Sequence, residues 1–396
     1  MDATTVTVQP YGSDQAVTVD LRAIYAQFAQ VPDQRRRRGV RYPLAVLLTI
    51  ALWAKLTGAH QVQAIAEWAH ERRGELAERF DLARPQMPHP TTWSRVLAGA
   101  VAVSALDAAL NRLLAAPPSS EVPVPASQHV ALDGKTLRGT IPTGSTQGLH
   151  LLSAYAIGTG QVLAQEAVTT KENEIVAAPR LLGRLALHGT IISGDAMFAQ
   201  RPLSTQIVEA GGHYCWVVKE NQPTLLADLQ LLFSPRLIPV APGWSPIPLD
   251  FTIAEQHTKG HGRREYRRLT TSSLLAGYSD WPYLAQAFQV VRITWQGRSI
   301  SREERYGITS APVNLAPASR LLTVVRGHWQ IENGLHYRRD VTLQEDASQL
   351  RRGHAPQVIA SLNNTICGLA AQLGVRNLAA LQRSLAAALD RILFQV

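Results

Sequence analysis

The chain has 396 residues, which is too long for one small core, so we expect two or three domains. Its 39 Lys and Arg outnumber 30 Asp and Glu, and the formal charge of +9 favours a polyanionic partner, with nucleic acid as the first candidate and an anionic membrane as the second. Its two cysteines, Cys215 and Cys367, exclude a disulfide framework and a cysteine-rich zinc site, and we expect both to be buried thiols.

The longest apolar run, Pro43–Ala54, stops at Lys55 and is shorter than the roughly 20 residues that a membrane-spanning helix needs. We therefore predict a buried helix there and no membrane partner. The first ten residues, MDATTVTVQP, lack the basic start and apolar centre of a secretion signal. The predicted location is the cytoplasm.

Residues 1–18 are polar and aperiodic, which favours a flexible tail. Residues 19–118 show helical patterning, and we predict an all-helical N-terminal DNA-binding domain. Its cation cluster consists of Arg35, Arg36, Arg37 and Arg38. Arginines beside a rigid helix can clamp phosphates, but an exposed loop that only aids solubility is an equally good explanation. The helix-turn-helix signal is weak, because no tight glycine turn separates two adjacent helices.

Residues 119–127 are rich in Pro and Ser, and we predict a linker there. From residue 128 to 222 the pattern changes to three short strands, followed by strands that alternate with helices. This order predicts an α/β fold, a mixed sheet with helices packed on it. Asp133 in LDG and Asp195 in SGDA each end a strand beside a glycine, so their carboxylates can converge at one sheet edge.

Residues 223–301 contain further strand-like segments, which predict a mostly β insertion. Its loop KGHGRREYRR, Lys259–Arg268, interleaves an aromatic ring with cations and could follow a nucleic-acid backbone. A solvated hairpin tip explains this loop slightly better. Residues 302–396 return to helical patterning and complete the predicted α/β domain.

The stretch RGHWQIENGLHYRRDVTLQED, Arg326–Asp346, has the apolar spacing of a helix, in which residues four apart share a face. His328, Glu332 and His336 then form a polar row, with Arg339 nearly in line. A carboxylate between imidazoles and a guanidinium indicates a functional site, because a lone buried carboxylate is costly. On spacing alone, however, a solvated helix face is the more frequent explanation.

Two strand-end aspartates and a later glutamate provide hard oxygen ligands that suit Mg²⁺ or Mn²⁺. Two such ions, about 4 Å apart, can serve phosphodiester chemistry. Three scattered acids are weak evidence alone, but the sequence around them is specific. The segments ALDGKTLRG, ISGDAMFAQ, VVKENQ and RGHWQIENGLHYRRDVTLQED resemble, in this order, the signature segments of ISAs-type insertion-sequence transposases, also called H-repeat-associated proteins. VPDQRRRRGVRYPL resembles their N-terminal associated domain, so the resemblance covers nearly the whole chain.

The resemblance implies a ribonuclease H-like catalytic fold of the DDE superfamily, in which Asp133, Asp195 and Glu332 hold two Mg²⁺ or Mn²⁺ ions. It implies binding to the terminal inverted repeats of an insertion sequence, hydrolytic cleavage of the ends, and joining of the freed 3′-hydroxyl to target DNA. Double-stranded DNA is the implied partner, bound by a homodimer at the bacterial nucleoid. The residues that we expect to hold DNA phosphates near the ions are Lys135, Arg138, Lys219, Asn221, Arg326, His328 and Arg339.

Three other acids belong to the same segment, Asp340, Glu345 and Asp346, and we expect them to be structural, paired with Arg338, Arg351 or Arg352. Two other functions remain open. A catalytically inactive, transposase-derived DNA-binding protein would keep the basic surface but tolerate loss of an acid, whereas all three acids are present. A glycosidase with paired carboxylates is disfavoured by the positive charge and by an aromatic content of 6%.

Overall fold

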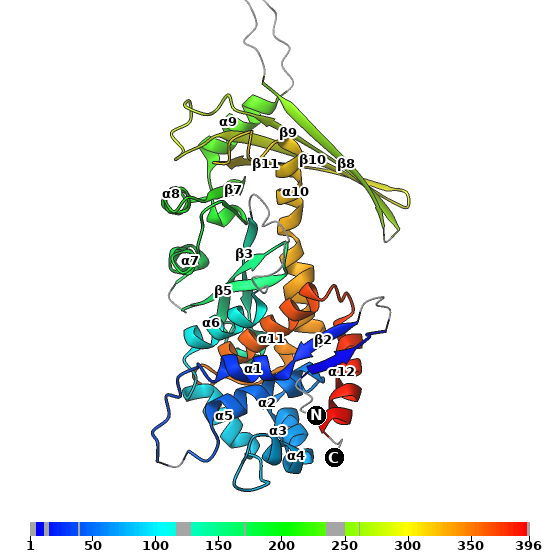
Figure 1. Cartoon of the computed structure of the whole chain (residues 1–396). Coiled ribbons are helices and arrows are strands. Elements are labelled where there is room, and N and C mark those ends of the chain that lie inside the picture. Colours follow the sequence, from blue (N-terminus) through cyan, green and yellow to red (C-terminus); the bar gives the residue numbers. More distant parts are fainter. Residues whose placement is uncertain are drawn as a thin grey trace, which may run out of the picture.

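Figure 1 shows the computed structural model, with helices α2 to α5 at one end of the molecule and strands β8 to β11 at the other. The structure describes residues 5–11, 16–38, 40–115, 128–169, 172–234, 250–260 and 262–393. The linker predicted at residues 119–127 lies outside this part of the chain.

One mixed sheet runs through the molecule and contains nine strands of the described residues, in the order β5-β4-β3-β6-β7-β11-β10-β9-β8. Strand β3 pairs in parallel with β6, and β6 with β7, whereas the other neighbouring strands are antiparallel. The strands are β3 Gln128–Thr136, β4 His150–Ala156, β5 Gln161–Val168, β6 Thr190–Gly194, β7 His213–Val218, β8 Thr252–Gly260, β9 Arg263–Ser272, β10 Gln286–Gln296 and β11 Ser299–Thr309. The predicted α/β class with a mixed sheet is confirmed.

Helices cover both faces of the sheet, which explains why the central strands are almost continuously apolar. On one face, Leu132 and Trp216 pack in a cluster with apolar residues of α7, α8 and α9. On the other face, Ile191 packs with residues of α10, and Ala131 packs in a cluster that includes α11. The helices are α7 Glu174–Leu182, α8 Arg201–Glu209, α9 Pro223–Phe233, α10 Ala318–His328 and α11 Ala355–Gln372.

The β-rich segment is part of the main sheet. Strand β11 pairs antiparallel with β7, with Tyr306 opposite Val218 and Thr309 opposite Cys215. It therefore crosses the boundary that we predicted at residue 301 and joins β8, β9 and β10 to the strands that carry the two aspartates. The other domain boundaries that we predicted from the sequence remain predictions.

The N-terminal helices share one apolar core with the end of the chain. This core contains side chains such as Leu48 and Trp93 together with Ile331, Leu335 and Leu381. The helices are α1 Leu21–Phe28, α2 Leu44–Leu56, α3 Val62–Glu71, α4 Arg73–Arg79, α5 Pro90–Gly99, α6 Val103–Leu114 and α12 Leu378–Leu393. Contact through this core couples the N-terminal helices to the helix that carries Glu332.

The flexible tail predicted for residues 1–18 is wrong for part of that segment. Strand β1, Thr5–Val8, pairs antiparallel with β2, Val17–Asp20, in a small sheet. Val6 and Val8 of β1 and Val17 and Val19 of β2 are buried, while the alternating residues face outward. The strand β1 contacts α12, so a partner from the far end of the chain stabilises it.

The residue spacing predicted a regular α-helix after α10. The structure differs from this prediction. It contains two π-helical segments, Glu332–His336 and Arg338–Thr342. A π-helix forms i→i+5 hydrogen bonds, and such segments are frequent at functional sites. A side chain on Gly334 would collide with the hydroxyl of Tyr155 in β4, so glycine allows the first segment to lie close against the sheet. In the described part of the chain, no helix has both the length and the apolar character needed to cross a membrane.

Candidate active site

The parallel pairing of β3 with β6 brings Asp133 and Asp195 side by side. Leu132 lies opposite Gly194 in the register of the two strands, and each aspartate is the next residue. Neighbouring strands are about 4.8 Å apart, so the two backbones can present both carboxylates to one ion pair. Asp133 is partly buried, whereas the side chain of Asp195 is 73% exposed.

Glu332 comes to this sheet edge from the first π-helical segment. Burial raises the pKa of Glu332, and the negative charges of Asp133 and Asp195 raise it further, together with a hydrogen bond to the Asp133 carboxyl. His336 opposes these effects. The three acids that are far apart in the sequence are therefore close enough to repel one another electrostatically.

Two histidines of the row around Glu332 each face one aspartate. His336 Nε2 lies 3.1 Å from Asp133 Oδ2, and His328 Nε2 lies 3.6 Å from Asp195 Oδ1. The interaction with His328 is the main reason why the pKa of Asp195 is lowered, with smaller effects from Lys219 and Arg305. The polar row therefore converges on the two aspartates, with His336 buried, His328 half-buried and Glu332 exposed.

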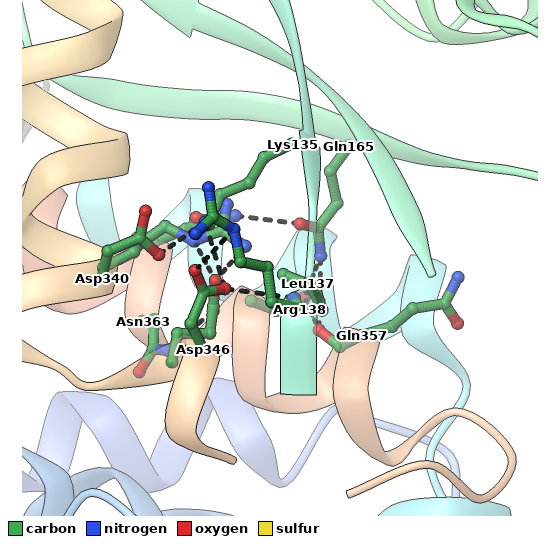
Figure 2. Close-up of polar contacts among 12 residues, drawn as sticks. Lys135, Leu137, Arg138, Gln165, Asp340, Asp346, Gln357 and Asn363 are labelled. Atoms are coloured by element: carbon green, nitrogen blue, oxygen red, sulfur yellow. Dashed lines mark hydrogen bonds and ion pairs between the residues drawn. The ribbon is translucent and has the colours of Figure 1, made fainter. Parts of the chain in front are cut away.

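Lys135 and Arg138 lie beside this cluster, but acids already hold them. Figure 2 shows both side chains turned toward Asp340 and Asp346. The buried Lys135 ammonium lies 2.5 Å from Asp340 Oδ1 and 3.4 Å from Asp346 Oδ1. Arg138 is exposed, with its Nε 3.6 Å from Asp346 Oδ2. The expected structural role of Asp340 and Asp346 holds, but their partners come from β3 and the turn that follows it.

The structure does not place Arg339 at the candidate site. Its side chain is 0% exposed, its Nε donates to Glu345 Oε2 over 2.8 Å, and its Nη2 lies 2.7 Å from the same oxygen in an ion pair. Asn363 Nδ2 donates to the other oxygen of Glu345 over 2.8 Å. Regular α-helical spacing had put Arg339 in line with Glu332, and the π-helical segments change that alignment. Glu345 is thus paired with Arg339 and not with the arginines we expected.

The remaining predicted DNA contacts divide into exposed and occupied groups. Lys219 and Arg326 are exposed, whereas Asn221 donates its amide hydrogen to the Ala196 carbonyl over 2.7 Å. In the N-terminal cluster, Arg35 is held by Asp33 at 2.7 Å. Its neighbours Arg36, Arg37 and Arg38 are exposed.

A basic groove that the sequence did not reveal lies between α10 and strands β8 to β11. Its volume is about 730 Å³, and Arg305 and Trp329 at its wall also line a small pocket that contains Asp195. Its charged lining consists of Arg263, Arg267, Arg292, Arg305 and Arg326 with Glu265 and Glu303. Each of these arginines is visible in the sequence. Only the pairing of the strands, for example β10 with β11 where Val290 lies opposite Arg305, brings them to one groove.

Comparison with known families decides the identity. Residues 125–365 match the family model described as "Transposase DDE domain", and residues 25–114 match the one described as "DDE_Tnp_1-associated". The chain belongs to the DDE transposase family. The resemblance that the sequence motifs indicated is confirmed, including its N-terminal part.

Several relatives of this DDE transposase match over most of their length. "Putative transposase YncI" of Escherichia coli O157:H7 is 28% identical over 360 residues, which cover 89% of this chain and 88% of that protein. "H repeat-associated putative transposase YhhI" of Escherichia coli (strain K12) is 27% identical over 355 residues, covering 87% of this chain and 89% of that protein. "Uncharacterized protein in dhlA 3'region" of Xanthobacter autotrophicus is 33% identical over 287 residues, covering 72% and 92%.

DDE transposases generally use divalent metal ions, and the acids of this transposase fit that chemistry. Carboxylate oxygens are hard ligands, and the pKa of Glu332 is raised first by burial and then by the charges of Asp133 and Asp195, a repulsion that a cation would relieve. Among the described residues, no group of three or more His, Cys, Asp or Glu side chains is already arranged to hold a metal.

Proposed function

We propose that this transposase binds the terminal inverted repeats of an insertion sequence, cleaves the ends by two-metal-ion phosphodiester hydrolysis and joins the 3′-hydroxyl ends to target DNA. The observation that carries the proposal is the mutual electrostatic effect among Asp133, Asp195 and Glu332 at one sheet edge. The family supports a role in transposition, and the chemistry of three carboxylates supports the cleavage step.

Asp133, Asp195 and Glu332 would hold the two Mg²⁺ or Mn²⁺ ions. When bound, the ions activate the attacking oxygen and stabilise the leaving oxygen. Protons compete with the ions for the carboxylate of Glu332, because its pKa is raised and only its ionised form can serve as a ligand. His336 keeps Asp133 in place through its 3.1 Å contact.

The exposed cations around the acids and the half-buried imidazole of His328 would hold the DNA phosphates. Lys219, Arg326, Arg138 and His328 have this role in the proposal, because each lies at the cluster or along the groove that leads to it. Lys135, Asn221 and Arg339 do not contact DNA in this proposal, because other groups of the protein already bind them. Their partners are Asp340, the Ala196 carbonyl and Glu345, respectively. These contacts position DNA and do not read its sequence.

The basic groove would take the DNA beside the cleaved bond. Five arginines against two glutamates leave a positive lining that attracts a phosphate backbone. Recognition of the terminal repeats would then fall to the N-terminal helices, where Arg36, Arg37 and Arg38 are exposed. We further propose that two copies act together on DNA in the bacterial cytoplasm, at the nucleoid.

Cleavage of labelled DNA that carries the ends of the element tests the proposal, with Mg²⁺ or Mn²⁺ in the reaction. We expect cleavage by the wild type and a loss of orders of magnitude in Glu332→Gln, which keeps the volume and removes the charge. Glu209→Gln, an exposed glutamate at the end of α8, is the matched control and should cleave normally. Binding to the ends without cleavage by the wild type would support the inactive DNA-binding alternative. Full cleavage by Glu332→Gln would refute the assignment.

A further inference from the structure

A chain of three polar side chains lies directly behind Asp195. His129 Nε2, on β3, lies 2.7 Å from Ser193 Oγ, on β6, and the same oxygen lies 3.1 Å from His328 Nδ1 at the end of α10. The far side of the His328 ring faces Asp195 Oδ1 over 3.6 Å. His129 is 8% exposed and Ser193 is 3% exposed, so solvent does not replace these bonds.

The direction of these hydrogen bonds follows from the carboxylate of Asp195, which lies at one end of the row of side chains. A carboxylate only accepts, and the 3.6 Å contact with Asp195 favours electrostatically the tautomer of His328 whose Nε2 carries the hydrogen. In the neutral imidazole of His328, Nδ1 is then the acceptor and Ser193 donates to it. The Ser193 oxygen in turn accepts from His129 Nε2.

The surroundings of His129 support this direction. Burial lowers the pKa of His129 to about 3, and the charge of Arg320 acts in the same sense, so its ring stays neutral and has one N–H to donate. A side chain on Gly327 would come within 3.1 Å of His129 Nδ1. The glycine therefore lets α10 approach the ring closely enough for the chain of bonds to close.

We propose that Ser193 and His129 are positioning residues that hold the His328 ring with its Nε2–H directed at Asp195 and at the DNA phosphate beside it. Hydrogen bonds that orient an imidazole from behind fix its tautomer and ring angle, and at metal-bound histidines their loss costs about 10- to 100-fold in metal affinity or activity. The phosphate contact rests on the proposed function, whereas the fixed tautomer of His328 does not.

Nuclear magnetic resonance of the full chain with ¹⁵N-labelled histidine tests the tautomer, and His328→Gln identifies the signal. We expect the Nε2–H tautomer in the wild type and a mixture of tautomers in Ser193→Ala. Ser204→Ala is the matched control, because its buried hydroxyl accepts from Trp216 Nε1 over 3.0 Å in another part of the sheet. This control should leave the His328 signal unchanged.

Cleavage kinetics provide the second readout. Ser193→Ala should lower kcat about 10- to 100-fold with little change in KM for DNA. His129→Gln can place an amide N–H near the position of Nε2 and should retain most activity, whereas His129→Leu should behave like Ser193→Ala. If Ser193→Ala does not fold, the two His129 variants decide between the outcomes.

An unchanged His328 tautomer in Ser193→Ala or in His129→Leu would overturn the proposal. So would an equal loss of activity in His129→Gln and His129→Leu, which would indicate packing alone. A wild type that does not cleave DNA but shows the expected change of tautomer would refute the proposed function and leave the positioning role intact.

Discussion

Replacing Glu345 with Gln should destabilise the protein more than any exposed charge change, because Glu345 is the counter-ion for two buried cations. Its side chain is 2% exposed and accepts one hydrogen bond from Arg339 Nε and one from Asn363, and Arg339 Nη2 lies 2.7 Å from it in an ion pair. Its charge also opposes the burial that lowers the pKa of Lys55, a fully buried ammonium whose hydrogen-bond acceptor is the His60 carbonyl. In the Glu345→Gln variant, the new side-chain amide would present an N–H₂ group where donors already point.

The expected loss is about 3–5 kcal/mol, the usual cost of removing one partner from a buried ion pair and leaving the other uncompensated. Urea titrations followed by tryptophan fluorescence measure the free energy of unfolding. Glu172→Gln, which breaks an exposed pair with Arg180 at 2.8 Å, is the control and should change little. A loss below about 1 kcal/mol in Glu345→Gln would refute the view that this pair joins the Glu332 helix to the shared core.

Three further predictions concern other charged groups. Burial raises the pKa of Asp107 to about 6, against the effects of Ser361 and Arg184, so the folded state binds the proton more tightly and stability should fall as pH rises from about 4 to about 6. Asp107→Asn should remove this slope in melting temperatures measured across that pH range. Lys55→Met should melt at or above the wild-type temperature at pH 7, because a pKa lowered to about 8 means that the charged form is disfavoured by about 3 kcal/mol; a marked loss of stability would contradict this. Arg326→Ala should reduce the log–log salt slope of DNA binding by about 0.9, whereas Arg376→Ala, an exposed arginine just before α12, should not.

The sequence allowed the two aspartates to be placed because their positions depend on local signals. Asp133 and Asp195 each follow a buried apolar run and flank a glycine, which predicts strand ends. Asp195 does follow the end of β6, but the prediction is wrong for Asp133, because β3 continues past it to Thr136 in its pairing with β4. Parallel pairing of the two strands then brings them together in register. The catalytic assignment of Asp133, Asp195 and Glu332 remains a prediction.

The surroundings of Glu332 were less predictable, since a π-helical segment has no residue pattern of its own. The α-helical spacing placed His328, Glu332 and His336 correctly on one side, because these residues span little more than two turns. Over the seven residues to Arg339 the difference accumulates, and Arg339 lies in the core instead.

Contacts between distant segments were the other source of error. The strand β1 is four residues long, too short for its alternation of Thr and Val to stand out in the sequence. Its burial depends on α12, at the opposite end of the chain. In the same way, the basic groove depends on the pairing of β10 with β9 and β11, which no local pattern predicts.

Calorimetric titration with Mn²⁺ tests the central claim most directly, because it measures metal binding at the three acids without any DNA. The wild type should bind Mn²⁺, and its affinity should fall as the pH is lowered, because protons compete with the ion for Glu332, whose pKa is raised. Glu332→Gln and Asp133→Asn should bind far more weakly, while Glu209→Gln should match the wild type. Equal Mn²⁺ binding by all four proteins would contradict a metal site at Asp133, Asp195 and Glu332.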